Sequence, residues 1–197
     1  MKNKKPKYNQ IMEAAIKVIA ENGFHGAQVS KVAKEAGVAE GTIYLYFKNK
    51  EDILISIFTE KMGQYVQEVI KETSKKQNAK EKLYTLIEMH FKQFMNNHHL
   101  AVVTQLELRQ SNYDLRLKIN KNILKPHVDV IDKIIVEGIE EGVFKSNINI
   151  RLMRQMIFGT LDDIVTNWVM NNHKYDLLEQ VEEVYELLTN GLYVQSQ

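Results

Sequence analysis

The sequence predicts an all-α protein, in which a small N-terminal head of three helices precedes a larger C-terminal helical body. Apolar residues recur at helical spacing along most of the chain, and no segment shows the sustained alternation of a β-strand. Polar segments, several of which contain Gly or Asn, interrupt this periodicity at residues 73–79, 96–99, 111–112, 141–149 and 171–174. We therefore expect about nine helices in all, with the head at residues 1–50 and the body at residues 51–197.

The first helix of the head is expected over residues 8–22. Its apolar residues repeat every three or four positions and form one face: Ile11, Ala14, Ala15, Val18 and Ile19. Gly23 follows directly and is expected to cap the C-terminus of this helix.

Two short helices and one long helix are expected next. Ser30 can cap the N-terminus of the second helix, and Gly37 can turn the chain after it. The third helix is expected over residues 40–47. Asn49 then precedes a long helix whose first turn carries two acidic residues, as the helix dipole favours.

The composition excludes several classes of protein. A chain of 197 residues is long enough to bury a substantial core, and the absence of Cys excludes disulfides and thiolate chemistry. No uninterrupted apolar run approaches 18 residues, and no apolar segment follows the basic N-terminus. We therefore expect no membrane span and no signal peptide, and we place the protein in the cytoplasm.

Charge is distributed unevenly between the two parts. Residues 1–50 carry nine Lys and four Glu, a net charge of +5, whereas residues 51–197 carry 17 basic and 21 acidic groups, a net charge of −4. A basic head on a mildly acidic body predicts a polyanionic partner for the head alone.

The segment 29–50 is typical of a helix-turn-helix, in which two short helices are joined by a turn that contains Gly. The second helix of this motif places its N-terminal residues in the major groove of double-stranded DNA. Hydroxyls, tyrosine rings with polar tips and lysines suit base and phosphate contacts, whereas Ile43 and Phe47 are expected to pack behind them. The predicted DNA-binding residues are Ser30, Lys31, Glu40, Gly41, Thr42, Tyr44, Tyr46, Lys48 and Lys50.

Over residues 8–60 the sequence resembles the TetR family of transcriptional regulators. The resemblance is carried by Gly-Val at 37–38, Gly-Thr-Ile-Tyr at 41–44, Tyr-Phe at 46–47 and Lys-Glu-Asp at 50–52. It implies a DNA-binding head on a helical ligand-binding domain that dimerises through its last two helices. Ala39 departs from the family, whose members often carry a Ser there that caps the recognition helix.

The last two predicted helices are rich in apolar residues, which agrees with a homodimer interface. In the last helix these residues cover a broad arc, although a monomer core explains part of them. They are Leu177, Leu178, Val181, Val184, Tyr185, Leu188 and Leu192, and the preceding helix adds Met153, Met156, Ile157, Phe158, Ile164 and Trp168. Earlier in the body, Pro126 is expected to kink or restart the helix predicted over residues 115–138.

Residues 106–112 and 158–163 resemble the fatty-acid-degradation regulators of Bacillus-type bacteria within the TetR family. This resemblance implies repression of β-oxidation genes and release from DNA by long-chain acyl-CoA, an effector rather than a cofactor. Arg109 would meet the CoA end at the mouth of an apolar cavity, or would instead pair with Glu107 or Asp163. The predicted ligand-binding residues are Phe91, Phe94, Gln105, Leu106, Arg109, Asn112, Tyr113, Phe158, Gly159, Asp163 and Trp168.

Two alternatives to an acyl-CoA-responsive repressor require different residues. A multidrug-sensing repressor would keep the head and bind a hydrophobic or cationic drug, for which Glu88, Glu107, Asp162 and Asp163 supply negative charge. An enzyme is not expected, because no Glu has a His three residues later, as a di-metal bundle requires, and no Gly-rich phosphate loop is present. His98 and His99 are adjacent and cannot share one helix face, so no metal site is expected there.

Overall fold

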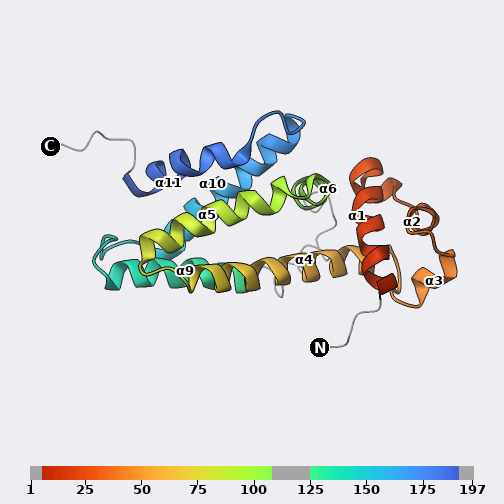
Figure 1. The fold of residues 1–197 in the computed structure, drawn as a ribbon, viewed down its shortest axis with the longest axis horizontal. Helices are drawn as coiled ribbons and strands as arrows, with labels where there is room; N and C mark the ends of the chain where they lie inside the picture. The colour runs from red at the N-terminus through yellow and green to blue at the C-terminus, as the bar shows by residue number, and fades with distance from the viewer. Residues whose placement is uncertain (1–5, 108–124, 191–197) are drawn as a thin grey trace. The chain divides into compact units, whose positions relative to one another are not determined.

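The structure is a computed structural model that describes residues 6–107 and 125–190 (Figure 1). Within these ranges the chain forms nine α-helices and two short helices of other types, without a strand, which confirms the predicted all-α class. None of the described helices combines the length and apolar character that crossing a membrane requires. The chain divides into two compact units, Met1–Gly63 with His99–Ile123, and Gln64–His98 with Leu124–Gln197.

The first unit contains α1 (Pro6–Gly26), α2 (Val29–Glu35), α3 (Glu40–Tyr44) and the first part of α4 (Lys50–Thr73). Most of α6 (His98–Val102) and the π-helix η1 (Val103–Glu107) also belong to it, and η1 packs against α1. The buried core joins the predicted apolar face of α1 to residues of the other elements, among them Val32, Ile43, Phe47, Leu54, Ile57 and Val103.

The second unit contains the rest of α4, α5 (Ala79–Met95), α9 (Lys125–Glu140), α10 (Ile150–Met170), the 3-10 helix η3 (Leu177–Gln180) and α11 (Val181–Asn190). Within this unit α5 packs against α9, α10, η3 and α11 (Figure 1). Its core is built from large apolar side chains, including Leu83, Leu86, Phe91, Ile135, Leu161 and Trp168.

Several helix ends differ from the sequence prediction. The first helix continues to Gly26, but Gly23 interrupts it with non-helical angles (φ 70°, ψ 158°). The second helix begins after Gln28, without a side-chain cap, so the prediction that Ser30 caps it is wrong. The third helix ends at Tyr44 rather than at residue 47. Short-range propensity does not fix such boundaries, because packing against the core decides where the last turn unwinds.

Other predicted ends are confirmed. Asn49 caps α4, because its side-chain oxygen accepts a hydrogen bond from the Asp52 amide at 2.8 Å. Gly37 adopts a positive φ of 61°, which the turn between α2 and α3 requires. Pro126 lies in the first turn of α9, where its missing amide hydrogen costs no helical hydrogen bond.

Candidate functional site

The α2–turn–α3 segment separates a buried face from an exposed one. Ile43 and Phe47 are only 1% and 2% exposed, whereas Tyr44 and Leu45 are 53% and 81% exposed. The turn is closed by hydrogen bonds from the Gly37 and Val38 amides to α2 carbonyls, at 3.1 and 3.0 Å. The predicted packing of Ile43 and Phe47 is therefore confirmed, and the opposite face of α3 is available to a partner.

The predicted DNA-binding residues are gathered on this segment with different exposures. Tyr44 lies on the exposed face of α3, whereas the Thr42 and Tyr46 side chains are half-buried. Tyr46 meets the edge of the Tyr8 ring at a centroid distance of 6.1 Å, and Tyr8 stacks on Phe47 at 5.0 Å. Tyr8 thus positions Tyr46, a role that the sequence pattern did not reveal. The remaining exposed members are Ser30, Lys31, Glu40, Gly41 and Lys48.

The lysines of the predicted set differ in their contacts. The Lys50 ammonium donates to the carbonyls of Phe24 (2.6 Å) and His25 (3.1 Å) near the end of α1, and lies 4.7 Å from the centroid of the Phe24 ring. The Lys31 ammonium donates to the Asn22 side chain at 2.8 Å. Lys48 is exposed, and only its backbone amide is held, by the Asp52 carboxylate at 2.8 Å. Lys48 is therefore better placed than Lys50 to contact phosphate.

Glu107 contacts the first helix, which the sequence did not predict. Its carboxylate accepts a hydrogen bond of 2.6 Å from the Phe24 amide, across 83 residues of sequence. Because Gly23 interrupts α1, the Phe24 amide needs a partner outside the regular helix. Glu107 ends η1 directly before the segment that contains Arg109, Asn112 and Tyr113, three predicted ligand residues that lie outside the described ranges.

The described ligand residues fall into two groups. Gln105 and Leu106 belong to η1 in the first unit, whereas the other six belong to α5 and α10 in the second. Phe91, Phe94 and Trp168 are buried and Phe158 is half-buried, but Gly159 and Asp163 lie on the exposed face of α10. The second unit thus brings the aromatic members into its core, while these two α10 residues face outward.

Three polar rings lie beside the predicted aromatic residues in the core of the second unit. Tyr65 of α4, His90 of α5 and His127 of α9 have ring centroids 5.4 to 6.2 Å apart. Phe94 lies 5.3 Å from His90, and Phe158 lies 5.5 Å from His127. We refer to Tyr65, His90 and His127 as the polar triangle. Sequence reasoning missed it, because its members are 25 or more residues apart.

Trp168 is held by a specific set of contacts at the end of α10. Its ring nitrogen donates to the Tyr175 carbonyl at 2.7 Å. The His98 and His173 rings stack at 4.4 Å, and they meet Trp168 edge to face at interplanar angles of 89° and 74°. These contacts fix the turn after α10, so Trp168 has a structural role whether or not it also touches a ligand.

Exposed apolar side chains lie on α10 and on the helices after it. On α10, Leu152 and Met156 are four residues apart, Gly159 and Asp163 continue the same exposed stripe, and Met170 lies near its end. Leu178 of η3 and Leu187 of α11 are also exposed. Large apolar side chains at this spacing are typical of a surface that another protein chain covers.

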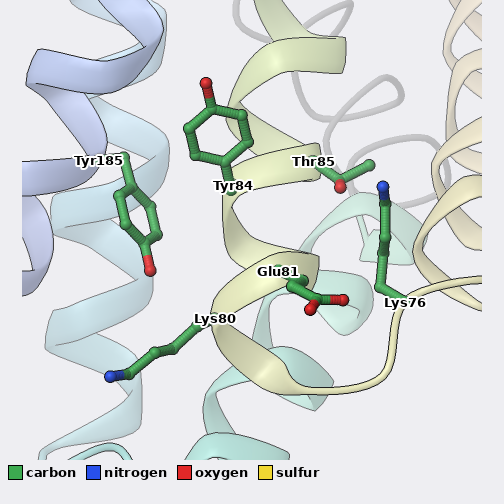
Figure 2. A pocket seen from close by; sticks show the side chains of 6 residues that line it. All are labelled: Lys76, Lys80, Glu81, Tyr84, Thr85 and Tyr185. Atoms are coloured by element: carbon green, nitrogen blue, oxygen red, sulfur yellow. The ribbon is translucent and has the colours of Figure 1, made fainter.

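A surface pocket of about 240 Å³ lies between the start of α5 and α11 (Figure 2). Its lining includes Lys76 from the preceding loop, Lys80 and Glu81 from α5, and Tyr185 from α11. Burial and a hydrogen bond to Glu182 raise the pKa of Tyr84, which also lines it. None of the predicted ligand residues lines this pocket. In the part of the chain that the structure describes, no three acidic or histidine residues are grouped to hold a metal ion.

Comparisons with known proteins agree on one family. Residues 11–57 match the family described as bacterial regulatory proteins, tetR family, and residues 58–191 match the C-terminal region of YsiA-like proteins. The chain is 58% identical over 193 residues to the fatty acid metabolism regulator protein of Bacillus subtilis, which covers 98% of this chain and 99% of the relative.

Two solved structures of fatty acid degradation regulators are similar throughout. The FadR structure from Bacillus halodurans has a TM-score of 0.95 and 57% identity, covering 97% of this chain and 98% of that one. The FadR structure from Bacillus subtilis in complex with stearoyl-CoA has a TM-score of 0.91 and 57% identity, covering 94% of this chain and all of that one.

Proposed function

The chain belongs to the TetR family of bacterial regulatory proteins, and we propose that it represses fatty acid degradation (β-oxidation) genes until long-chain acyl-CoA releases it from operator DNA. The observation that carries this proposal is the 58% identity, over nearly the whole chain, to a fatty acid metabolism regulator. The stearoyl-CoA complex of a similar FadR supports the class of effector. The relatives are regulators rather than enzymes, and we place this one in the cytoplasm with its operator.

We propose that α3 enters the major groove with Tyr44 and Thr42 toward the bases, and that Tyr46, Lys48 and Ser30 contact the backbone. The exposure of Tyr44 and Lys48 supports these roles. Lys50 binds carbonyls near the end of α1, so its main contribution to DNA binding would be to hold α1 in place.

We propose that two chains associate through the exposed stripe of α10 together with η3 and α11. Leu152, Met156 and Met170 would bury apolar surface there, and Gly159 would allow close approach of the partner helix. A two-fold dimer presents two heads to successive major grooves, as a palindromic operator requires.

We propose that the acyl chain occupies the aromatic core of the second unit, near Phe91, Phe94 and Phe158. Arg109, with Gln105 and Asn112, would bind the CoA end, and Leu106 and Tyr113 would also contact the ligand. In this proposal, ligand binding favours head spacings that do not match two half-sites. The coupling free energy expected for such a shift is about 1–3 kcal/mol. Helix α4 contributes residues to both units and supplies a direct covalent route for the coupling.

The test is an operator-release assay. An operator is selected from random double-stranded DNA with the purified protein, and its binding is followed by fluorescence anisotropy. We expect palmitoyl-CoA or stearoyl-CoA to release the DNA at concentrations at which palmitate and a cationic dye do not. Release by the dye alone would contradict the acyl-CoA proposal and support a multidrug sensor.

A pair of variants tests the DNA-binding face in the same assay. Tyr44→Ala should abolish specific operator binding while it leaves acyl-CoA affinity nearly unchanged. Tyr84→Ala, which removes a tyrosine from the body, is the matched control and should bind the operator normally. An unchanged operator affinity for Tyr44→Ala would overturn the placement of α3.

A further inference from the structure

The polar triangle is unusual because its polar atoms are buried without hydrogen-bond partners. The Tyr65 hydroxyl, both ring nitrogens of His90 and Nε2 of His127 are enclosed, and none of them makes a hydrogen bond in the described structure. A buried polar atom without a partner costs free energy, because it has lost its hydrogen bonds to water. Such a cluster therefore calls for a partner that enters from outside.

The three groups are neutral at physiological pH. Burial lowers the pKa of His90 to about 3, with a smaller contribution from His127, and burial lowers the pKa of His127 to about 4. Burial also raises the pKa of the Tyr65 hydroxyl. The triangle thus offers O–H and N–H donors without a positive charge.

The surroundings of the triangle are apolar. The Phe94 and Phe158 rings flank the two histidines, and Phe91 is buried next to His90 in α5. A complementary ligand therefore has one neutral acceptor oxygen attached to a long hydrocarbon. Acyl-CoA has this character at its thioester, where a single carbonyl oxygen adjoins the acyl chain.

We propose that Tyr65, His90 and His127 bind the thioester carbonyl oxygen of the acyl-CoA, and that they select the thioester against the carboxylate of a free fatty acid. This inference rests on the proposed function and names the groups that would distinguish the two chemical forms. A carboxylate would bring a negative charge into a neutral, apolar site, where desolvation opposes it. A thioester oxygen carries no charge and satisfies donors that otherwise lack a partner.

The enclosed position of these atoms has a consequence for binding. Water does not reach them, so the ligand must displace at least one ring in order to make the hydrogen bonds. Because the three rings come from α4, α5 and α9, their displacement would alter the packing of three helices. The triangle would thereby link recognition of the carbonyl to a change in the body.

The experiment compares stearoyl-CoA with its thioether analogue S-octadecyl-CoA, which lacks only the carbonyl oxygen, and with stearate, which has a carboxylate in place of the thioester and CoA. Dissociation constants are measured by calorimetry on the full-length protein. We expect stearoyl-CoA to bind about 10-fold to 100-fold more tightly than the thioether, because loss of the oxygen leaves buried donors without a partner. Stearate should bind more weakly than stearoyl-CoA by at least the same factor.

Isosteric variants assign the effect to the triangle. Tyr65→Phe removes only the hydroxyl, and His90→Phe removes both ring nitrogens while it keeps an aromatic ring. Each should reduce the ratio of the thioether to the thioester dissociation constant toward one. Phe94→Leu is the matched control, which should weaken both ligands alike and leave the ratio unchanged. Thermal melting of each variant confirms that it is folded.

The outcomes distinguish failure of the role proposed for the triangle from failure of the proposed effector. Equal affinity of the wild-type protein for thioester and thioether, or a ratio that Tyr65→Phe and His90→Phe leave unchanged, would overturn the role of the triangle while the repressor function stands. Failure of all three probes to bind would overturn the proposed effector, and the role of the triangle with it.

Discussion

The hydrogen bond between Glu107 and the Phe24 amide gives a quantitative prediction about the head. Gly23 removes Phe24 from the regular helical pattern, and the Glu107 carboxylate satisfies its amide at 2.6 Å. Glu107→Ala leaves this partly buried donor without an acceptor. We therefore expect a loss of stability that exceeds the effect of an ordinary surface substitution.

The size of the loss follows from the type of bond. A hydrogen bond to a charged group contributes about 1.5–3 kcal/mol, and partial exposure of Glu107 places the expected value near the lower end. For a protein of this length each kcal/mol lowers the melting temperature by about 2–4 °C. Glu107→Ala should therefore melt about 3–8 °C below the wild-type protein. Glu107→Gln keeps a neutral acceptor and should lose about half as much.

The assay is thermal and urea unfolding followed by circular dichroism, with Glu68→Ala as the matched control. Glu68 is an exposed glutamate of α4, and its removal should change stability by less than about 0.5 kcal/mol. If Glu107→Ala melts with the wild-type protein and with Glu68→Ala, the contact does not hold α1 to η1, and our account of the Gly23 interruption is refuted.

Three further predictions concern other parts of the chain. Because burial lowers the pKa values of His90 and His127 to about 3 and 4, the unfolded chain binds protons at both below about pH 6.5 while the folded chain does not. The free energy of unfolding, measured by urea titration, should be highest above pH 6.5 and should fall toward pH 4 by up to about 1.4 kcal/mol per pH unit and per histidine. If the free energy of unfolding of His90→Phe fell equally steeply with pH, this prediction would be wrong. In α9, a Cβ at Gly138 would overlap the Phe144 ring. Gly138→Ala should therefore lower the free energy of unfolding by about 1–2 kcal/mol, although Ala has the better helix propensity. Gly63 has open space around it, so Gly63→Ala should raise the free energy of unfolding by up to about 1 kcal/mol in the same assay. Lys48→Ala should weaken binding to all DNA sequences and reduce the slope of log K against log salt by about 1, because one phosphate contact is lost. Lys76→Ala, in the body, is the control and should leave this slope unchanged. An altered base preference in Lys48→Ala would show that Lys48 contacts bases instead.

The helix-turn-helix could be predicted because its determinants are local. Gly37, the capping Asn49 and the alternation of Ile43 and Phe47 with exposed residues all act within a few positions of sequence. The helix ends were less predictable. Gln28 rather than Ser30 precedes α2, because the positions that must face the core set where the helix begins.

The ligand region of the body was less predictable than the head, because its residues meet over long sequence separations. The sequence identified Phe94 and Phe158 as candidates for the ligand region, but it did not indicate that His90 and His127 lie beside them or that Tyr65 completes the triangle. Equally, the pattern of α10 did not show which of its residues face outward, and Gly159 and Asp163 proved to be exposed. The individual roles of the predicted ligand residues, and the domain boundary after residue 50, stay predictions.

The sequence by itself determined the all-α class, the order of the helices and the position of the head, since periodicity, turn residues and charge act at short range along the chain. Only the tertiary structure decided which distant residues meet: Glu107 with Phe24, Lys50 with carbonyls near the end of α1, and the three rings of the polar triangle. The physical reason is that a buried polar group takes whatever partner the packing of helices brings to it, and that packing depends on the whole core rather than on any one segment.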